Sequence, residues 1–481
     1  MNFQIIKRTL GFLMLFEAIF FLVPTLTAAI YWEKEFFDFL IAIGICLAVA
    51  GLCLFRKPKN TNIYAKEGFV IVALSWIALS LVGAVPFVTS GVIPSYVDAL
   101  FETISGFTTT GSSVIPSEQL ESLPKSILMW RSFTHWVGGM GVLVLIMAFL
   151  PLSGARNMHL MKAESPGPQV SKLVPKVRST AKVLYLIYAA MTVLMFVLLV
   201  FDMPVFDALN TAFATAGTGG FAIKSDSMAG YSAYSQIVTT VFMVLFSINF
   251  NSYFLILLGK IKEAFNLEVR VFLGIVFAAI AAIALNVLLT DGYGYSVGEA
   301  ILHSSFSVAS IISTTGFATE NFDLWPAFSK TILVLLMFIG ACAGSTGGGI
   351  KVSRTIILYK GATHEMKRVL HSKQVKKITV DGRIVEHEVV RNVNAYIIAY
   401  ILIFVASLLL ISFDCQDLTT GFTAVATTLN NVGPGLGAVG PAGNFAFFSD
   451  FSTLVLSFNM LAGRLELFPI LLLFAPSTWR K

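Results

Sequence analysis

Ten long apolar stretches, separated by short polar links, run through the whole chain. A helix that crosses a bilayer needs about 20 mainly apolar residues, and each stretch is close to that length. They lie near residues 9–31, 37–55, 68–90, 127–152, 183–203, 235–259, 269–290, 329–350, 393–413 and 450–475. The first stretch is long and no clear small-residue cleavage site follows it, so we interpret it as a span rather than a signal peptide. The pattern predicts an all-α integral membrane protein with ten transmembrane helices.

A shorter pattern recurs four times between these spans: an amphipathic segment that leads into a Thr/Gly-rich stretch. The segments are too short to cross a bilayer, and they lie at 96–107, 206–216, 299–311 and 417–428. The first two copies align without a gap, because Asp98 precedes Gly111, and Asp207 precedes Gly220, by thirteen residues. We therefore predict four short helices that enter the membrane from one side, each between two spans.

The repeat divides the chain into similar units. An N-terminal pair of spans occupies residues 1–60, and the predicted units are 61–165, 166–262, 263–375 and 376–481. Each unit contains a span, a short helix with its Thr/Gly-rich stretch, and a second span. We predict that these four membrane-pore-membrane units surround one central pore.

Helix-start signals mark the short helices. Ser95-x-x-Asp98 and Ser296-x-x-Glu299 have the pattern of capping boxes, and Pro204 suits a first helical turn. The acidic residues near these starts have two open interpretations. They are either helix caps or groups that attract cations to the pore.

Composition and charge placement support a polytopic membrane protein. Of the 481 residues, 56% are hydrophobic and only 12% charged, and the mean hydropathy is +0.81, whereas soluble domains carry about 25% charged residues. When the links are assigned alternately to two sides, one side has 27 Lys and Arg against 8 Asp and Glu, and the other has 4 against 16. The positive-inside rule places the basic side, with both termini, in the cytoplasm. We interpret the basic links as topology signals within a lipid membrane, so no nucleic-acid partner is expected.

One stretch in each unit has the residues to carry the chemistry. The stretches are Thr109-Thr110-Gly111, Thr218-Gly219-Gly220, Thr314-Thr315-Gly316 and Asn431-Val432-Gly433. Glycine admits the positive φ that turns successive carbonyls to one side, and rings of carbonyl oxygens replace the hydration shell of a cation. Gly and Thr are also common in membrane helices, so one stretch alone indicates little. Four copies at equivalent positions predict a filter for monovalent cations.

These stretches, with their neighbours, resemble the filters of a known family. Thr-Thr-Thr-Gly-Ser at 108–112, Thr-Gly-Gly-Phe at 218–221, Thr-Thr-Gly-Phe at 314–317 and Asn-Asn-Val-Gly-Pro-Gly at 430–435 resemble the four filters of TrkH-type potassium transporters in the Trk/Ktr/HKT superfamily. The resemblance covers essentially the whole chain. It implies uptake of potassium, as the substrate, through a gated channel-like pore, with no cofactor in this chain. In some plant relatives a serine replaces the first glycine and accompanies sodium transport, so Gly111 favours potassium.

The resemblance also implies partners and a location. The expected partners are a cytoplasmic nucleotide-binding regulatory subunit of the TrkA type and a second copy of this chain in a homodimer. The expected location is the bacterial plasma (inner) membrane. Neither partner follows from the residues themselves.

Five glycines between residues 340 and 349 interrupt the predicted span 329–350. Because each costs a helix about 1 kcal/mol relative to alanine, they predict a broken helix. Its loop, Gly344-Ser345-Thr346-Gly347-Gly348-Gly349, would lie under the filter and close the pore, as the gating loop of the resembling family does. A phosphate-binding loop does not fit, since Ile350 separates Gly349 from Lys351 and no strand precedes it. Close helix packing through small residues stays open as the alternative.

Arg464 is the second candidate gate residue. It follows Asp450 by fourteen residues, about 21 Å along a helix, and a cation at that depth usually faces a partner or a cavity. We hypothesise that Arg464 donates to carbonyls of the Gly344–Gly349 loop and repels cations when the gate is closed. A purely structural pairing with another helix is the alternative, and Glu466 should point elsewhere. The resemblance implies that an arginine at this point helps to close the pore.

Other candidate chemistry is weak. His135 could indicate a proton relay, but a single histidine without an obvious partner is more often a packing or hydrogen-bonding residue. Since no catalytic constellation stands out, we do not expect an enzyme. A proton- or sodium-coupled secondary symporter stays the alternative function, although such transporters often have inverted repeats, whereas these four hairpins enter from one side.

Overall fold

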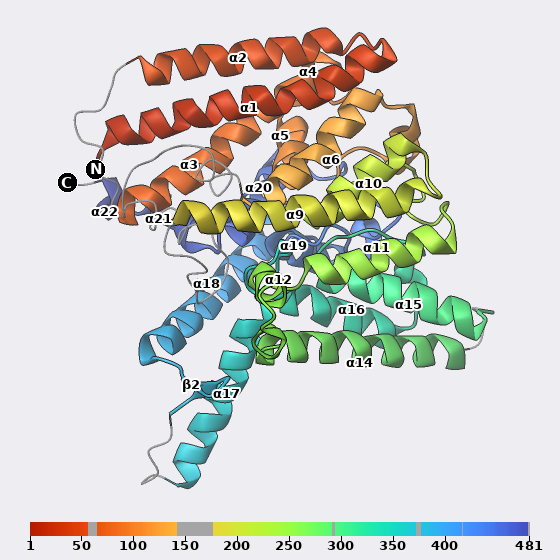
Figure 1. Ribbon diagram of the computed structural model, residues 1–481, viewed down its shortest axis with the longest axis vertical. Helices are drawn as coiled ribbons and strands as arrows, with labels where there is room; N and C mark the ends of the chain where they lie inside the picture. The colour runs from red at the N-terminus through yellow and green to blue at the C-terminus, as the bar shows by residue number, and fades with distance from the viewer. Residues whose placement is uncertain (56–64, 142–176, 291–293, 372–376, 416, 480–481) are drawn as a thin grey trace.

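The computed structural model describes residues 1–55, 65–141, 177–290, 294–371, 377–415 and 417–479. The described chain is helical apart from one antiparallel hairpin, β1 (Thr379–Val380) with β2 (Arg383–Ile384), which confirms the all-α class. Most of the long helices run roughly side by side (Figure 1). Many large apolar side chains point outward, such as Leu186, which is 71% exposed, and Leu285. Such a surface is stable against lipid tails and unfavourable in water.

The first two helices form a hairpin at the edge of the molecule. They are α1 (Phe3–Tyr31) and α2 (Phe36–Leu54), which pack against each other along their length. α1 also contacts helices of the first unit on its inner face. The hairpin therefore covers one side of the ring of units without entering its centre.

Each unit begins with a long helix and continues with a short one, as the sequence predicts. The long helices are α3 (Ala65–Gly83, continued by α4, Val85–Thr89), α9 (Val177–Val200), α14 (Leu267–Leu289) and α18 (His387–Ile411). The short pore helices are α5 (Tyr96–Phe107), α10 (Val205–Gly217), α15 (Val297–Ile312) and α19 (Leu418–Asn430). All four pore helices start and end within two residues of the predicted bounds. In the part of the chain that the structure describes, six helices are long and apolar enough to cross a membrane, or seven if one bent pair is counted as a single span.

The third helix of each unit is shorter than predicted. These helices are α6 (Lys125–Gly139), α11 (Ala233–Phe246), α16 (Ala327–Ile339) and α20 (Asp450–Arg464). They have 13 to 15 residues, or about 20–23 Å of helix, against a hydrocarbon core of about 30 Å. All four therefore stop part of the way through a membrane. Residues 142–152 of the first predicted span lie outside the described residues.

The sequence predicted one break in these helices, between 340 and 349, but the structure has two more. In the second unit α12 (Phe250–Leu257) follows α11 at an angle of 91°, because the Asn249 side chain accepts from Asn251 N and starts a new helix. In the fourth unit Glu466 and Leu467 have φ of +56° and +65°, and α21 (Phe468–Phe474) starts with Pro469 in its first turn. The predicted spans 235–259 and 450–475 are therefore each interrupted by a break rather than continuous helices.

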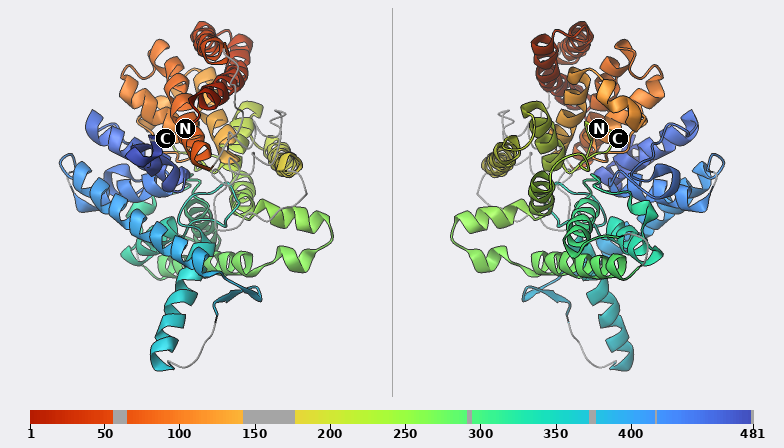
Figure 2. Two further views of the ribbon diagram at one scale, coloured as in Figure 1. Left: turned by 90° about the vertical axis from the view of Figure 1, so that its left-hand side faces the viewer. Right: turned by 90° about the vertical axis from the view of Figure 1, so that its right-hand side faces the viewer.

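The four units form a closed ring. Each pore helix packs against the third helix of the preceding unit: α10 against α6, α15 against α11, α19 against α16, and α5 against α20. The last contact joins the fourth unit to the first. Figure 2 shows the result, with the chain colour running around a common centre from orange through green to blue.

The remaining elements lie in the links. α13 (Ile261–Ala264) and α17 (Val352–Leu370) follow the breaks of the second and third units, α22 (Pro476–Trp479) ends the described chain, and three 3-10 turns occur at η1 (Ser117–Ser122), η2 (Phe322–Leu324) and η3 (Gly437–Val439). α17 projects beyond the ring beside the β-hairpin, and both termini lie at one end of the bundle (Figure 1). The predicted unit boundary at 262/263 falls within α13. The boundaries at 60/61, 165/166 and 375/376 lie outside the described residues.

Candidate ion-conducting site

Capping residues fix the starts of the pore helices. Ser296 and Glu299 form the predicted capping box at α15, and the Ser95 hydroxyl accepts from Asp98 N at 3.3 Å at α5. At α10, Pro204 is the residue before the helix rather than part of its first turn. These local bonds satisfy N–H groups that a buried helix start would otherwise leave without acceptors.

Two of the acids at these starts, Asp417 and Glu299, are caps. Asp417 accepts from Thr420 N at 2.8 Å and from the Thr420 hydroxyl at 2.6 Å. The bond from the Thr420 hydroxyl, and after it the bond from Thr420 N, hold the pKa of Asp417 below its usual range. The carboxylate is therefore ionised at neutral pH. The capping interpretation is confirmed for Asp417 and Glu299, and attraction of cations by the same charges stays a prediction.

All four pore helices end with the same backbone conformation. The first residue of each filter stretch is left-handed: φ is +56° at Thr109, +57° at Thr218, +61° at Thr314 and +56° at Asn431. The next N–H returns to the carbonyl five residues back, from Thr110 to Ser105, Gly219 to Ala214, Thr315 to Ser310 and Val432 to Thr427, at 2.8–2.9 Å. This bond pattern ends a helix and turns the chain away from its axis. A left-handed residue other than glycine costs roughly 1–2 kcal/mol, and the same cost recurs in every unit.

The four aligned glycines come next, and each touches the following unit. Their φ values are +82° at Gly111, +73° at Gly220, +88° at Gly316 and +100° at Gly433. A Cβ added to Gly111 would overlap with Gly219 O, one on Gly220 with Thr315 O, one on Gly316 with Val432 O, and one on Gly433 would lie 2.8 Å from Thr110 O. The contacts run from unit 1 to 2, 2 to 3, 3 to 4 and 4 back to 1. The four stretches therefore enclose one axis, with the carbonyl of each middle residue beside the glycine of its neighbour.

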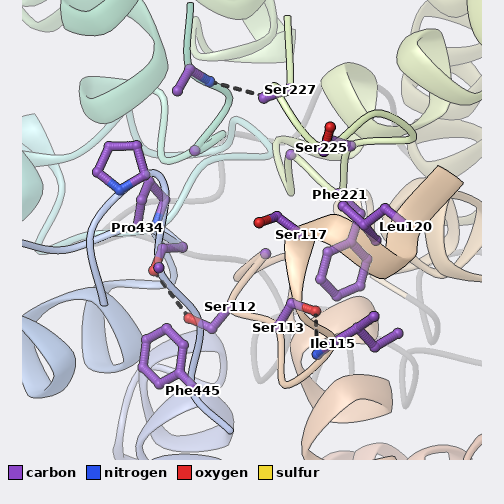
Figure 3. Close-up of a pocket in the computed structure, with 18 of the residues that line it drawn as sticks. Ser112, Ser113, Ile115, Ser117, Leu120, Phe221, Ser225, Ser227, Pro434 and Phe445 are labelled. Atoms are coloured by element: carbon purple, nitrogen blue, oxygen red, sulfur yellow. Dashed lines mark hydrogen bonds between the residues drawn. The ribbon is translucent and has the colours of Figure 1, made fainter. Parts of the chain in front are cut away.

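A hollow opens beside this ring (Figure 3). All four glycines line it, together with Ser112, Phe221 and Pro434. The Ser112 hydroxyl donates to Gly433 O at 3.1 Å, and the Asn431 amide donates to the Thr110 hydroxyl at 2.9 Å. These two bonds fasten the most divergent fourth stretch to the first.

Two buried oxygens at the ring are without hydrogen-bond donors among the described residues. They are Thr109 Oγ1 and Asn431 Oδ1. Both belong to the left-handed residues that precede the ring carbonyls. A buried polar atom without a partner is costly, and an oxygen is the ligand that an alkali cation takes. The Asn431 side chain lies against α20, with its Oδ1 beside Gly463 and its Nδ2 donating to Met460 O at 2.9 Å.

The glycine-rich loop lies directly against the filter stretches. Gly348 N donates to the Thr314 hydroxyl at 2.6 Å, and Gly349 N donates to Asn430 O at 3.0 Å. Gly340, Gly344 and Gly349 have φ of +68°, +75° and +78°. Since this backbone is not helical, the alternative of helix packing through small residues is wrong.

The other side of this loop is hydrogen-bonded to the break between α11 and α12 in the second unit. Thr346 Oγ1 donates to Phe246 O at 3.1 Å, and Cys342 N donates to Ser247 O at 3.1 Å. Phe250 N in turn donates to Gly344 O at 3.0 Å. The carbonyls that α11 leaves free at its end thus accept from the loop, so the two breaks satisfy each other's backbone groups.

Arg464 joins the loop to the first unit. Its guanidinium donates to Thr346 O at 2.8 Å, to Gly138 O at 2.5 Å and to Gly139 O at 2.7 Å. The expected contact with the loop is confirmed, and the two acceptors at the end of α6 are additional. Whether this contact gates the pore stays a prediction at this point.

Sequence reasoning missed further charged groups around the loop. Lys351 is 3% exposed and its ammonium donates to Gly347 O, while Glu268 Oε1 accepts from Ala343 N at 2.7 Å. Glu466 points away from Arg464, as predicted, and pairs with Arg354. The signal was present for Lys351, because a lysine directly after a glycine-rich break in an apolar span has free carbonyls within reach.

Comparisons with known proteins agree on one family. Residues 35–481 match the TrkH family, described as a cation transport protein. The chain is 36% identical to the Trk system potassium uptake protein TrkH of Escherichia coli strain K12, with both chains covered completely. It is 32% identical to the Trk system potassium uptake protein TrkG of the same strain, over 99% of each chain. The crystal structure of the potassium transporter TrkH from Vibrio parahaemolyticus superimposes with a TM-score of 0.89 at 35% identity, over 100% of both chains.

Proposed function

Because the chain belongs to the TrkH family of cation transport proteins, we propose that it takes up potassium through a gated pore lined by its four glycine-bearing stretches. The observation that carries this proposal is the closed cycle of contacts from Gly111 through Gly220 and Gly316 to Gly433. Each stretch contributes a carbonyl that no helix uses, and carbonyl oxygens around an axis are the ligands of a dehydrated potassium ion. The relatives are named as transport proteins rather than enzymes.

The filter residues have distinct parts in this proposal. The carbonyls of Thr110, Gly219, Thr315 and Val432 form the principal ring, and the glycines after them keep the chain close enough for the ring to close. Thr109, Thr218, Thr314 and Asn431 precede the ring, and their left-handed backbone turns each chain from its pore helix toward the axis. The pore helices also direct the negative ends of their dipoles toward the ion.

The protein is a multi-pass protein of the inner membrane, with the filter entrance outside and both termini in the cytoplasm. The charge asymmetry of 27 against 4 basic residues supports this orientation. The common end at which both termini lie is consistent with it (Figure 1). Potassium would enter the hollow beside the ring and leave past the loop.

The gate in this proposal is the Gly344–Gly349 loop with Arg464. The loop contacts two filter stretches, so an ion that leaves the ring meets it first. Arg464 holds the loop against α6 and contributes a positive charge on the ion path. Opening requires the loop to exchange these hydrogen bonds for others, which a cytoplasmic nucleotide-binding subunit of the TrkA type, docked on a homodimer, would drive through α17.

Uptake of rubidium and sodium by cells that lack other potassium uptake tests the filter. Wild type is compared with Gly111→Ser and Gly316→Ser, whose side chains would enter the space of Gly219 O and Val432 O. We expect both variants to lose rubidium uptake and to lower the rubidium-to-sodium ratio. If both variants transport as wild type does, the filter assignment is wrong.

A further inference from the structure

The second filter stretch differs from the other three at its middle position. The units have Thr110, Thr315 and Val432 there, but the second unit has Gly219. The backbone does not demand this glycine, because Gly219 is absent from the positive-φ glycines while Gly220 is among them. Another cause must exclude a side chain.

That cause is the imidazole of His135. A Cβ added to Gly219 would overlap with Nδ1, Cγ and Cε1 of this ring. His135 lies on α6 of the first unit and is completely buried. Its ring therefore occupies the space behind the second stretch that threonine or valine side chains occupy behind the others.

The ring also holds the backbone on both sides of it. His135 Nδ1 lies 2.7 Å from Gly106 O, and Phe221 N donates to Nε2 at 3.3 Å. Since a carbonyl only accepts and an N–H only donates, the ring is neutral with its proton on Nδ1. His135 thus links the end of the first pore helix to the residue that follows Gly220.

Phe221 is held from a second direction. The centroid of its ring lies 4.3 Å from the centroid of the His135 ring. The guanidinium carbon of Arg131 lies 4.1 Å from the same Phe221 centroid. Arg131 lies one helical turn before His135 and donates to Ala222 O at 3.3 Å. A salt bridge from its Nε to Glu102 Oε1, at 2.8 Å, holds the guanidinium in place. The chain immediately after Gly220 is therefore clamped by one face of α6.

We propose that His135 is a positioning residue for the second filter stretch. Its imidazole replaces the missing side chain of Gly219 and fixes Phe221 N, so that the Gly219 carbonyl keeps its place in the ring and the pore selects potassium over sodium. This inference rests on the proposed function of the ring. It differs from the proton-relay interpretation, because both ring nitrogens are engaged by backbone groups.

A double-mutant cycle tests the spatial part of the proposal. The variants are His135→Ala, Gly219→Thr and the pair together, which makes the second stretch Thr-Thr-Gly as in units 1 and 3. We expect each single variant to lower the rubidium-to-sodium uptake ratio about five- to tenfold, the scale of one or two lost hydrogen bonds. The pair should recover much of the ratio, since the threonine enters the vacated space. A pair no better than the worse single variant overturns the proposal.

Two conservative variants test the hydrogen bonds. His135→Gln retains an acceptor at the distance of Nε2, and His135→Asn retains a donor at the distance of Nδ1. Selectivity should be retained better by Gln than by Asn, because Gln keeps the bond from Phe221 N. Equal ratios at equal amounts of folded protein in the membrane would refute the role of that bond.

Controls separate this proposal from the filter itself. His387→Ala, an exposed histidine at the start of α18, should leave the ratio unchanged. Gly111→Ser reports on the filter independently of His135. If Gly111→Ser lowers the ratio and His135→Ala does not, the positioning role is wrong and the filter stands; if neither changes it, the filter assignment itself is wrong. Should His135→Ala not reach the membrane, the Gln, Asn and double variants provide the same comparison.

Discussion

The ring of filter stretches and the loop beneath it are built in opposite ways. The ring uses four similar pieces of backbone, with the same left-handed residue and the same positive-φ glycine in each unit. The loop comes from the third unit alone and is held by charged side chains, Arg464 and Lys351. The ring repeats one backbone geometry four times, whereas the loop occurs once.

The difference shows what each region needs. A ring of carbonyls around an ion requires equal contributions from several sides, which repetition supplies without any charged side chain. A loop that closes the pore, as we propose for Gly344–Gly349, must be a single element, because four loops would compete for one axis. The freed carbonyls of a broken helix need donors, and inside a membrane Arg and Lys can serve as those donors.

Gly220→Ala should have the largest effect, because it breaks the repeated geometry at one of four places. The methyl would overlap with Thr315 O, and a left-handed alanine costs roughly 1–2 kcal/mol. We expect rubidium uptake to fall below about a tenth of wild type, since 1.4 kcal/mol corresponds to a factor of ten. Gly274→Ala on α14, where an added Cβ meets nothing within 4 Å, is the matched control. Normal uptake by the Gly220 variant would contradict the ring.

Arg464→Ala should have the next largest effect, on the unique region only. Three hydrogen bonds to carbonyls are lost, each worth about 1.5–3 kcal/mol when the donor is charged. We expect a higher basal flux with an unchanged rubidium-to-sodium ratio, measured in proteoliposomes without any regulatory subunit. Arg464→Lys should lie between, because an ammonium cannot span acceptors on both α6 and the loop. An unchanged basal flux in the alanine variant would remove Arg464 from the gate.

Lys351→Met should have a smaller effect in the same direction. It removes one donor to Gly347 O while the bonds from Arg464 remain, so the loop keeps its link to α6. We expect the basal flux to rise about tenfold, the scale of one hydrogen bond from a charged donor, and less than in the Arg464 variant. In the same proteoliposomes, combination with Arg464→Ala should be non-additive, because both side chains hold one loop. Additive effects would show that the two act on different elements.

Glu466→Gln should have the smallest effect on transport. The Arg354–Glu466 pair has side chains that are 8% and 23% exposed, and Arg354 keeps Ile350 O and the Tyr396 ring as partners. We expect the free energy of unfolding in detergent to fall by about 1–3 kcal/mol, measured by thermal unfolding. Flux and selectivity should be unchanged. A changed basal flux would extend the gate to this pair.

Much of the fold could be predicted because its signals are local. The pore helices have their caps and apolar faces within the segments themselves, and all four were found within two residues. The breaks at Ser247–Asn249 and Glu466–Leu467 were missed, because neither contains the run of glycines that marks 340–349. At Ser247–Asn249 the freed backbone groups bond with the distant loop of the third unit, which no local pattern shows. At Glu466–Leu467 the backbone N–H groups return to Gly463 and Ala462 in the helix just before the break, and no glycine marks the two left-handed residues.

The candidate site divides in the same way. Gly111, Gly220, Gly316 and Gly433 could be named from their spacing, and Arg464 from its depth in an apolar span. Lys351 and Arg131 were not, and His135 was weighed only as a lone histidine. Their roles depend on which carbonyl or ring lies opposite, as when His135 meets Phe221, 86 residues away.

By itself, then, the sequence determined the four short helices, the glycines that follow them and the polar break in the third unit, since these depend on backbone preferences over a few residues. Only the tertiary structure decided that the four stretches close into one ring, that His135 fills the space behind Gly219, and that Arg464 reaches Thr346, 118 residues before it. These facts depend on how units pack around an axis. Packing is set by the shapes of surfaces that come together only in the folded chain.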